Sequence, residues 1–276
     1  MAKDRAPTIQ PGDRVLAHDA GRGEDHLIVL DGGGARKQRG LGVFDPGRLA
    51  GMAWGSRARI GDKELVLLPP RLPDLGATLA RKAQIILPKD LSRIVYELGV
   101  ADGDRVLESG IGSGAATMAL AHAVGDRGRV VVQELREDFR DWAVDNLRRA
   151  GLDGRVEVHL GDLTQGLAAS AAAAGPFDAV LLDQPEPWLA APHLAGHLAP
   201  GARIACYTPQ VSQMENTVRA LQAQGFADVR ALELIERAWE VKERGSRPSF
   251  EGLGHTAFLA FARWLGPAPA PSRPSS

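Results

Sequence analysis

The sequence is poor in cysteine and has no long apolar run. Cys206 is the single cysteine among 276 residues, so an internal disulfide is excluded and a reducing compartment, the cytoplasm, is expected. No uninterrupted apolar stretch is long enough to span a bilayer, and the start, MAKDRAPTIQ, lacks the apolar core of a secretory signal. No cysteine and histidine cluster has zinc-ligand spacing, so we expect no metal site.

The charge is unevenly divided along the chain, although its net value is only −1. Residues 1–100 hold 16 lysines and arginines against 12 acidic residues, and the remainder holds 17 against 22. A polyanion should therefore prefer the first part. A surplus of this size is also common on solvated surfaces.

Two domains and a tail are predicted from the change in residue pattern. Short β-like runs broken by Gly- and Asp-rich turns indicate a small β domain over 1–75, and the Pro-rich segment LLPPRLPDLG ends it. Over 76–265 strand and helix patterns alternate, which predicts an α/β domain with a mostly parallel sheet that ends in an antiparallel hairpin. The Pro- and Ser-rich stretch 266–276 predicts a disordered tail. The less regular predicted elements are helices at 167–174 and 188–198 and strands at 228–239 and 254–264.

A glycine-rich turn between a predicted strand and a predicted helix indicates a nucleotide-like cofactor. In VLESGIGSGAAT, Gly110, Gly112 and Gly114 allow a tight turn, and the following helix offers free N–H groups. Gly110, Gly112 and Ala115 also satisfy the dinucleotide pattern G-x-G-x-x-A, so a nicotinamide enzyme stays open at this point.

Acidic residues near the ends of successive predicted strands favour S-adenosylmethionine over NAD. Glu134 follows Gly110 by 24 residues, where a carboxylate can accept both hydroxyls of a ribose. Glu108 would repel a pyrophosphate but could hold the ammonium group of a methionine moiety. Asp162 could accept from the adenine amino group, and Phe139 could lie against the ring. Each side chain alone also fits a structural role, Asp162 as a helix N-cap for example.

The segments ESGIGSG, QEL and LLDQPEPW, in this order, resemble those of the tRNA (adenine-58-N1)-methyltransferases. The resemblance extends to QIILPKD (84–90) and GHTAFLAFAR (254–263). It implies a Rossmann-like methyltransferase domain with a seven-stranded sheet, S-adenosylmethionine as cofactor, tRNA as substrate and a homotetramer whose N-terminal domain helps to grip tRNA. Leu87 departs from the family, which usually has tyrosine there.

The resemblance also implies roles for particular residues. It places Asp183 beside both the methyl donor and the target base, and Gln84 near the methionine end. The cofactor contacts that it implies are Ser113, Gly114, Ala115 with the adjacent Ala116, Glu134 and Asp162.

The chemistry of adenine gives Asp183 a role that does not depend on the family. Adenine N1 carries an in-plane lone pair, so attack on a sulfonium methyl group requires orientation and stabilisation of the resulting positive charge. A fixed carboxylate that accepts from the N6 amine provides both. Pro185 and Pro187 would restrict the loop, and Trp188 could form a flat wall or simply pack beneath it.

Basic residues are expected to bind the phosphates of a tRNA whose target base is extruded. His255 is expected to be structural, although the family places its motif close to the active site. A small-molecule or protein methyltransferase, a nicotinamide oxidoreductase and a noncatalytic RNA-binding module stay open as alternatives. The phosphate-binding candidates are Arg36, Lys37 and Arg39 in one segment and Arg237, Lys242, Arg244 and Arg247 in another.

Overall fold

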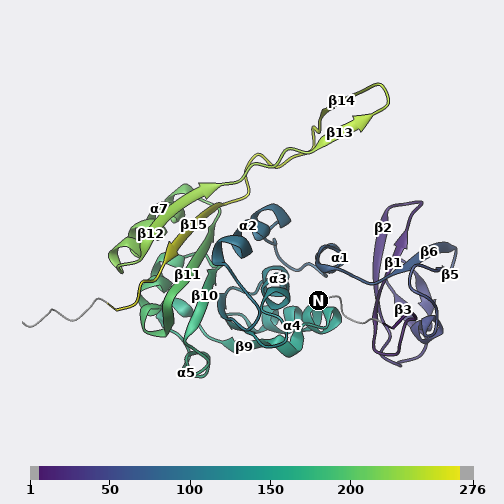
Figure 1. Ribbon diagram of the computed structural model, residues 1–276, viewed down its shortest axis with the longest axis horizontal. Coiled ribbons are helices and arrows are strands. Elements are labelled where there is room, and N and C mark those ends of the chain that lie inside the picture. The colour runs from purple at the N-terminus through teal and green to yellow at the C-terminus, as the bar shows by residue number, and fades with distance from the viewer. Residues whose placement is uncertain (1–5, 268–276) are drawn as a thin grey trace, which may run out of the picture. The chain divides into compact units, whose positions relative to one another are not determined.

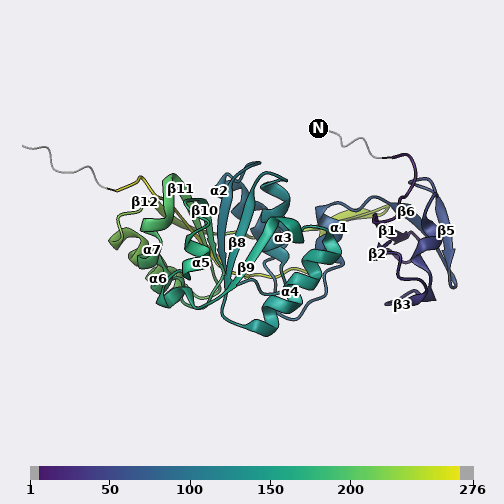
Figure 2. The same ribbon diagram turned by 90° about the horizontal axis from the view of Figure 1, so that it is seen from below.

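The computed structural model describes residues 6–267, in which the chain divides into two compact units (Figures 1 and 2). One unit comprises Met1–Arg81 and Val144–Asp153, and the other Lys82–Ala143 and Gly154–Ser276. Most of the predicted tail lies outside the described residues. Among the described residues, no helix has the length and apolarity needed to cross a membrane.

The first unit is built on a four-stranded antiparallel sheet with the order β2-β1-β6-β5. Alternating side chains of its strands bury a core that includes Val15, Ala17, Ile28, Leu65 and Leu67. Its elements are β1 (Arg14–Asp19), β2 (Glu24–Val29), the pair β3 (Arg36–Gln38) and β4 (Gly42–Phe44), β5 (Arg57–Ile60), β6 (Lys63–Leu68) and the short α1 (Leu72–Ala77).

The second unit is a seven-stranded sheet with the order β12-β15-β11-β10-β7-β8-β9. Its central strands are buried on both faces, as expected of a parallel sheet flanked by helices. The strands are β7 (Arg105–Ser109), β8 (Arg129–Glu134), β9 (Val156–Leu160), β10 (Phe177–Leu182), β11 (Leu198–Thr208), β12 (Ala227–Glu233) and β15 (Phe258–Arg263). The helices are α2 (Pro88–Leu98), α3 (Ala115–Ala123), α4 (Glu137–Ala150), α5 (Ala169–Ala172), α6 (Pro187–Ala190) and α7 (Val211–Ala223).

The order of the strands fixes where a ligand can bind. The chain passes from β7 outward to β8 and β9, and then returns to add β10 and β11 on the other side of β7. Such a reversal opens a crevice at the carboxyl ends of the two strands where it occurs, here β7 and β10. The predicted α/β fold is confirmed, and β15 runs antiparallel to both β11 and β12, as expected of the closing strand.

Three predicted elements differ from the structure. The helix expected at 188–198 is only the short α6 followed by 3₁₀ turns at Ala191–His193 and Ala195–His197, because Pro192 and Gly196 interrupt it. The helix at 167–174 shrinks to α5. The strand at 228–239 ends at Glu233, and Trp239 instead begins a separate hairpin of β13 (Trp239–Lys242) and β14 (Gly245–Pro248), which Figure 1 shows standing away from the sheet.

Candidate active site

A cavity of about 500 Å³ lies at the predicted crevice. Its walls come from the carboxyl ends of β7, β8, β9 and β10 and from the segment before α2. Six of the predicted cofactor residues line it beside Asp183: Gln84, Gly110, Gly112, Glu134, Phe139 and Asp162. Segments far apart in the sequence therefore meet in one pocket.

Gly110 is required because two backbones meet there. Its φ is +90°, and a Cβ atom would lie 1.9 Å from the carbonyl oxygen of Asp183. The amide of Asp183 in turn donates to the carbonyl of Ser109 at 2.8 Å. The glycine turn therefore packs directly against the Asp183 loop. Glycine is needed at position 110 for this close packing as well as for the approach of a ligand.

The rest of the glycine turn divides into exposed and buried positions. Gly112 lines the cavity with φ +51° and has nothing within 4 Å of an added Cβ. Ser113 is buried, and its hydroxyl accepts from the backbone amides of Lys82 at 3.0 Å and Ala83 at 3.2 Å. The other three predicted contacts, Gly114, Ala115 and Ala116, form the start of α3 and are not among the lining residues.

Glu134 and Asp162 each have structural bonds within the cavity wall. Glu134 accepts from the amides of Ile111 at 2.9 Å and Arg136 at 2.8 Å. Asp162 caps a 3₁₀ turn by accepting from the amide of Thr164 at 2.9 Å. Asp162 can therefore cap the turn and also bind a ligand in the cavity, because a carboxylate has further lone pairs that can accept hydrogen bonds.

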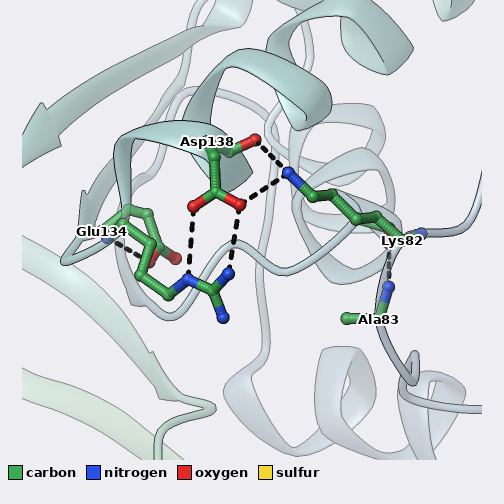
Figure 3. A network of polar contacts seen from close by, with 6 residues as sticks. Lys82, Ala83, Glu134 and Asp138 are labelled. Carbon is green, nitrogen blue, oxygen red and sulfur yellow. Dashed lines mark hydrogen bonds and ion pairs between the residues drawn. The ribbon is translucent and has the colours of Figure 1, made fainter.

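Asp138 joins two segments that both contribute residues to the cavity wall. It accepts from Lys82 Nζ at 2.6 Å (Figure 3) and from Arg136 at 3.1 Å. These two cations lower the pKa of Asp138 to about 2. Arg136 also lies 4.0 Å over the ring of Phe139. This polar network ties the segment that carries Ala83 to the start of α4.

Glu108 is a buried carboxylate without a hydrogen-bonding partner. It is fully buried on β7, and neither carboxylate oxygen has a partner of ordinary geometry among the described residues. Burial raises its pKa to about 8, and the charges of Asp183 and Glu134 add to the rise while nearby Thr117 opposes it. Such a group requires a cation or a proton. Glu108 does not itself line the cavity, so its contact with an ammonium group stays a prediction.

Asp183 lies just beyond β10, at the boundary of two cavities. Burial raises its pKa to about 7, with a further contribution from the charge of Glu134. Its loop is held from both sides: Gln184 accepts from the Ser109 hydroxyl, and Gln213 of α7 donates to the carbonyl of Pro185 at 2.9 Å. The loop is therefore braced by polar contacts as well as by prolines. Trp188, a suggested wall, is part-buried in α6 and does not line either cavity.

A second cavity of about 550 Å³ adjoins the first and shares Gln84, Asp183, Gln184 and Pro185 with it. Tyr207 and His255 line its other side. Burial raises the pKa of Tyr207 to about 12, and Asp90 and Asp183 add to the rise. Tyr207, Gln213 and the exposed Leu135 in the first cavity are the residues that sequence reasoning missed, although Leu135 directly follows Glu134 and is 66% exposed despite being apolar.

The basic side chains predicted to bind phosphates differ in whether an acidic residue already pairs with them. Arg36 is engaged by Asp31 and donates to the carbonyl of Val29, and Arg247 pairs with Glu240 and stacks on Phe250. The side chains of Lys37, Arg39, Arg237, Lys242 and Arg244 are exposed, although Lys242 also pairs with Glu240. In the part of the chain described, no cluster of His, Cys, Asp and Glu has the form of a metal site.

Comparison with known proteins identifies the family. Residues 66–247 match the family described as "tRNA methyltransferase complex GCD14 subunit". The chain is 36% identical over 256 residues to a tRNA (adenine(58)-N(1))-methyltransferase TrmI of Thermus thermophilus, and the match covers 92% of this chain and 98% of the relative. The chain belongs to this family. The resemblance of its motifs to the tRNA (adenine-58-N1)-methyltransferases is thereby confirmed.

Two further methyltransferases are similar to this chain over most of its length. The tRNA (adenine(57)-N(1)/adenine(58)-N(1))-methyltransferase TrmI of Methanocaldococcus jannaschii is 32% identical, with 71% of this chain and 77% of the relative covered. A crystal structure from Thermotoga maritima, described as a SAM-dependent O-methyltransferase, superposes with a TM-score of 0.78 at 32% identity, and covers 94% of this chain and 95% of its own. Family membership sets aside the nicotinamide oxidoreductase that the glycine pattern left open.

Proposed function

We propose that this protein transfers a methyl group from S-adenosylmethionine to N1 of adenine 58 in the T-loop of tRNA. The observation that carries the proposal is the position of Asp183, which lines both adjoining cavities. One cavity then holds the cofactor and the other the target base. The names and lengths of the family relatives support the choice of substrate.

The residues of the first cavity fit S-adenosylmethionine. The open space beside Gly112 admits a ligand close to the backbone. Glu108, which is buried on β7 and does not line the cavity, would act on the methionine ammonium group through its charge, because a nearby cation favours its ionised form. Glu134 would hold the ribose, while Asp162, Leu135 and Phe139 would surround the adenine. When bound, the cofactor supplies an electrophilic methyl group on a sulfonium.

Asp183 orients the acceptor in this mechanism. Its carboxylate accepts from the N6 amine of the target adenine, which points N1 toward the first cavity, and its charge stabilises the cation that forms on the ring. Gln213 and Ser109 keep the loop in place, so little reorganisation is needed during the reaction. Tyr207 lines the same cavity as Asp183 and would supply the aromatic surface that Leu87 does not.

Further parts of the proposal concern assembly and tRNA binding. We infer a homotetramer in the cytoplasm, in which the 1–75 domain, with Lys37 and Arg39, and the exposed cations of 237–244 bind tRNA phosphates. The β13–β14 hairpin supports an assembly, because Trp239 and Val241 are 62% and 82% exposed. The domain division at residues 75 and 76 belongs to the same proposal.

One experiment tests the reaction directly. The protein is incubated with methyl-labelled S-adenosylmethionine and unmodified tRNA, and the labelled nucleoside is mapped. We expect 1-methyladenosine at position 58 and no product with Asp183→Ala. Label on N6, on a ribose hydroxyl or on another base would refute the N1 assignment.

A second acceptor chemistry is favoured by one observation, the description of the Thermotoga structure as an O-methyltransferase. Transfer to a hydroxyl would need a base, and Asp183, with a pKa of about 7, has the properties of one. The same experiment separates the two reactions, because a hydroxyl acceptor would leave tRNA adenine unlabelled.

A further inference from the structure

Two segments that resemble family motifs, 84–90 and 254–263, meet in the folded chain although more than 160 residues separate them. Lys89 and Asp90 of α2 contact Thr256, which stands before β15. Neither the cofactor cavity nor the proposed chemistry uses these polar side chains. Their arrangement therefore needs another explanation.

Lys89 and Asp90 form the first half of the arrangement. The ammonium of Lys89 donates to Asp90 Oδ1 at 2.7 Å, to the carbonyl of Leu234 at 2.8 Å and to Thr256 Oγ1 at 2.7 Å. The Thr256 hydroxyl donates onward to Asp90 Oδ2 at 2.7 Å. Asp90 is fully buried, and all three donors of the ammonium are used. This is a closed polar network, in which the loss of any one hydrogen bond leaves a buried polar group without a partner and destabilises the fold.

His255 forms the second half. Its Nδ1 lies 2.6 Å from a carboxylate oxygen of Glu233, and its Nε2 lies 2.8 Å from the carbonyl oxygen of Pro209. Both partners only accept, so a ring that satisfies both must carry two protons. The hydrogen bond to Glu233 and then that to Pro209 raise the pKa of His255. His255 thus links Glu233, at the end of β12, to Pro209, which directly follows β11.

Both sets of contacts lie at the stems of one insertion. Residues 234–257 leave the sheet after β12, carry the β13–β14 hairpin and return to β15. Glu233 and Leu234 form the outgoing stem, and His255 and Thr256 form the returning one. We define Lys89, Asp90, Glu233, His255 and Thr256 as the stem clamp.

We propose that the stem clamp positions the far wall of the acceptor cavity and the base of the hairpin, so that it determines tRNA use without determining cofactor affinity. The inference rests on the proposed function. Pro209, His255 and Thr256 line the second cavity, and none of the five clamp residues lines the first. The clamp residues are positioning residues, because they act through the wall that they hold.

Thr256 provides the sharpest test because its hydroxyl connects Lys89 to Asp90. Thr256→Val keeps the shape and removes both bonds, whereas Thr256→Ser keeps the hydroxyl. We expect Thr256→Val to lower kcat/KM for tRNA about tenfold and Thr256→Ser to stay near the wild type. The Kd for S-adenosylmethionine should remain within about twofold in both variants. Thr78→Val, which removes a hydroxyl bonded to the carbonyl of Asp74 in the other unit, is the matched control.

Amide hydrogen exchange gives a readout that does not depend on catalysis. In Thr256→Val the stems at 233–236 and 253–257 should exchange faster, and Thr256→Ser and Thr78→Val should leave them unchanged. Equal behaviour of Val and Ser at position 256, or a parallel loss of cofactor affinity in Thr256→Val, would overturn the clamp. If the wild type leaves tRNA unmethylated, the proposed function fails, while exchange at the stems still decides whether the clamp holds them.

Discussion

Asp183 and Glu108 show how the surroundings of a carboxylate set its chemistry. Both are ordinary acidic residues in the sequence, and both acquire raised pKa values because burial disfavours their charged forms. Lysine and arginine neutralise neither of them, unlike Asp138, whose pKa is lowered by Lys82 and Arg136. We therefore expect both carboxylates to titrate in the neutral range.

We expect the activity to depend on the ionisation of Asp183. Its ionised form accepts more strongly from the adenine N6 amine, and only that form carries the charge that stabilises the cation on the ring, so kcat/KM for tRNA should rise with pH through about 7 and then level off. Initial rates across a pH series measure this rise. Asp183→Asn should be almost inactive at every pH. If this variant kept the rise of kcat/KM with pH that the wild type shows, the titration would belong to another group.

Glu108 should make the cofactor-free protein less stable as the pH rises. Its pKa is about 8 in the folded chain, above the ordinary value of 4.5, so the folded state binds the proton more tightly than the unfolded state. The free energy of unfolding then falls between these two values. Glu108→Gln should remove that part of the slope and be more stable than the wild type at pH 8 by about 1 to 3 kcal/mol.

Urea unfolding of the cofactor-free protein at pH 5 and pH 8 measures this difference. Asp183 contributes a slope of the same sign and remains in the variant. A Glu108→Gln variant with the unchanged wild-type slope would contradict the assignment.

At the scale of elements, the site depends on how the end of β7 meets the end of β10. The turn after β7 passes so close to the carbonyl of Asp183 that only glycine fits at position 110. The segment before α2 and the start of α4 form the opposite side, joined through Lys82 and Asp138. The residues that line the first cavity are therefore held in place by contacts between several segments and not only by the strand that carries each of them.

Gly110→Ala and Gly112→Ala should differ sharply although both positions have positive φ. At Gly110 the Cβ would overlap backbone atoms, and we expect a loss of about 2 to 4 kcal/mol of unfolding free energy. At Gly112 the space is open, so the loss should be about 1 kcal/mol, from the backbone conformation alone. Denaturant unfolding compares the two, and equal losses would contradict the close approach to Asp183.

Lys82→Met should weaken cofactor binding modestly. The Lys82–Asp138 ion pair is partly exposed, so we expect the Kd for S-adenosylmethionine to rise about two- to fivefold, with a smaller effect at high salt. Titration calorimetry at two salt concentrations measures this. Arg57→Met, which breaks the exposed pair with Glu64 in the other unit, is the control and should leave the Kd unchanged.

At the scale of the whole molecule, the insertion between β12 and β15 is the segment that our proposals connect with both tRNA use and assembly. Its hairpin exposes apolar side chains that a folded domain normally buries. Its stems end beside the acceptor cavity through the stem clamp. Contacts made by the hairpin can therefore influence the position of the wall of the acceptor cavity.

Replacing the apolar hairpin side chains should reduce the size of the assembly. Trp239→Ser with Val241→Ser removes apolar area that we expect to be buried between copies, so the mass measured by light scattering should fall below that of a tetramer. Val43→Ser, at another exposed apolar position on β4, should leave the mass unchanged. A double variant with the wild-type mass would exclude the hairpin from the interface.

The sequence by itself determined the fold class and predicted several residues that line the first cavity. Alternating strand and helix patterns, and acidic residues placed at successive strand ends, are local signals that survive without tertiary structure. Gly110, Glu134, Asp162 and Asp183 were found in this way. The hairpin was missed because the pattern of 228–239 does not reveal that pairing changes from β15 to β14 after Glu233.

Only the tertiary structure decided which distant groups meet. Tyr207, Gln213 and Thr256 lie on separate elements with no common spacing, and the chain brings them to one cavity by placing β15 between β11 and β12. The surroundings that raise the pKa values of Glu108 on β7 and of Asp183 just beyond β10 likewise depend on contacts between distant segments. Local patterns can place a residue at the end of a strand, whereas its partners and its desolvation follow from contacts between segments far apart in the chain.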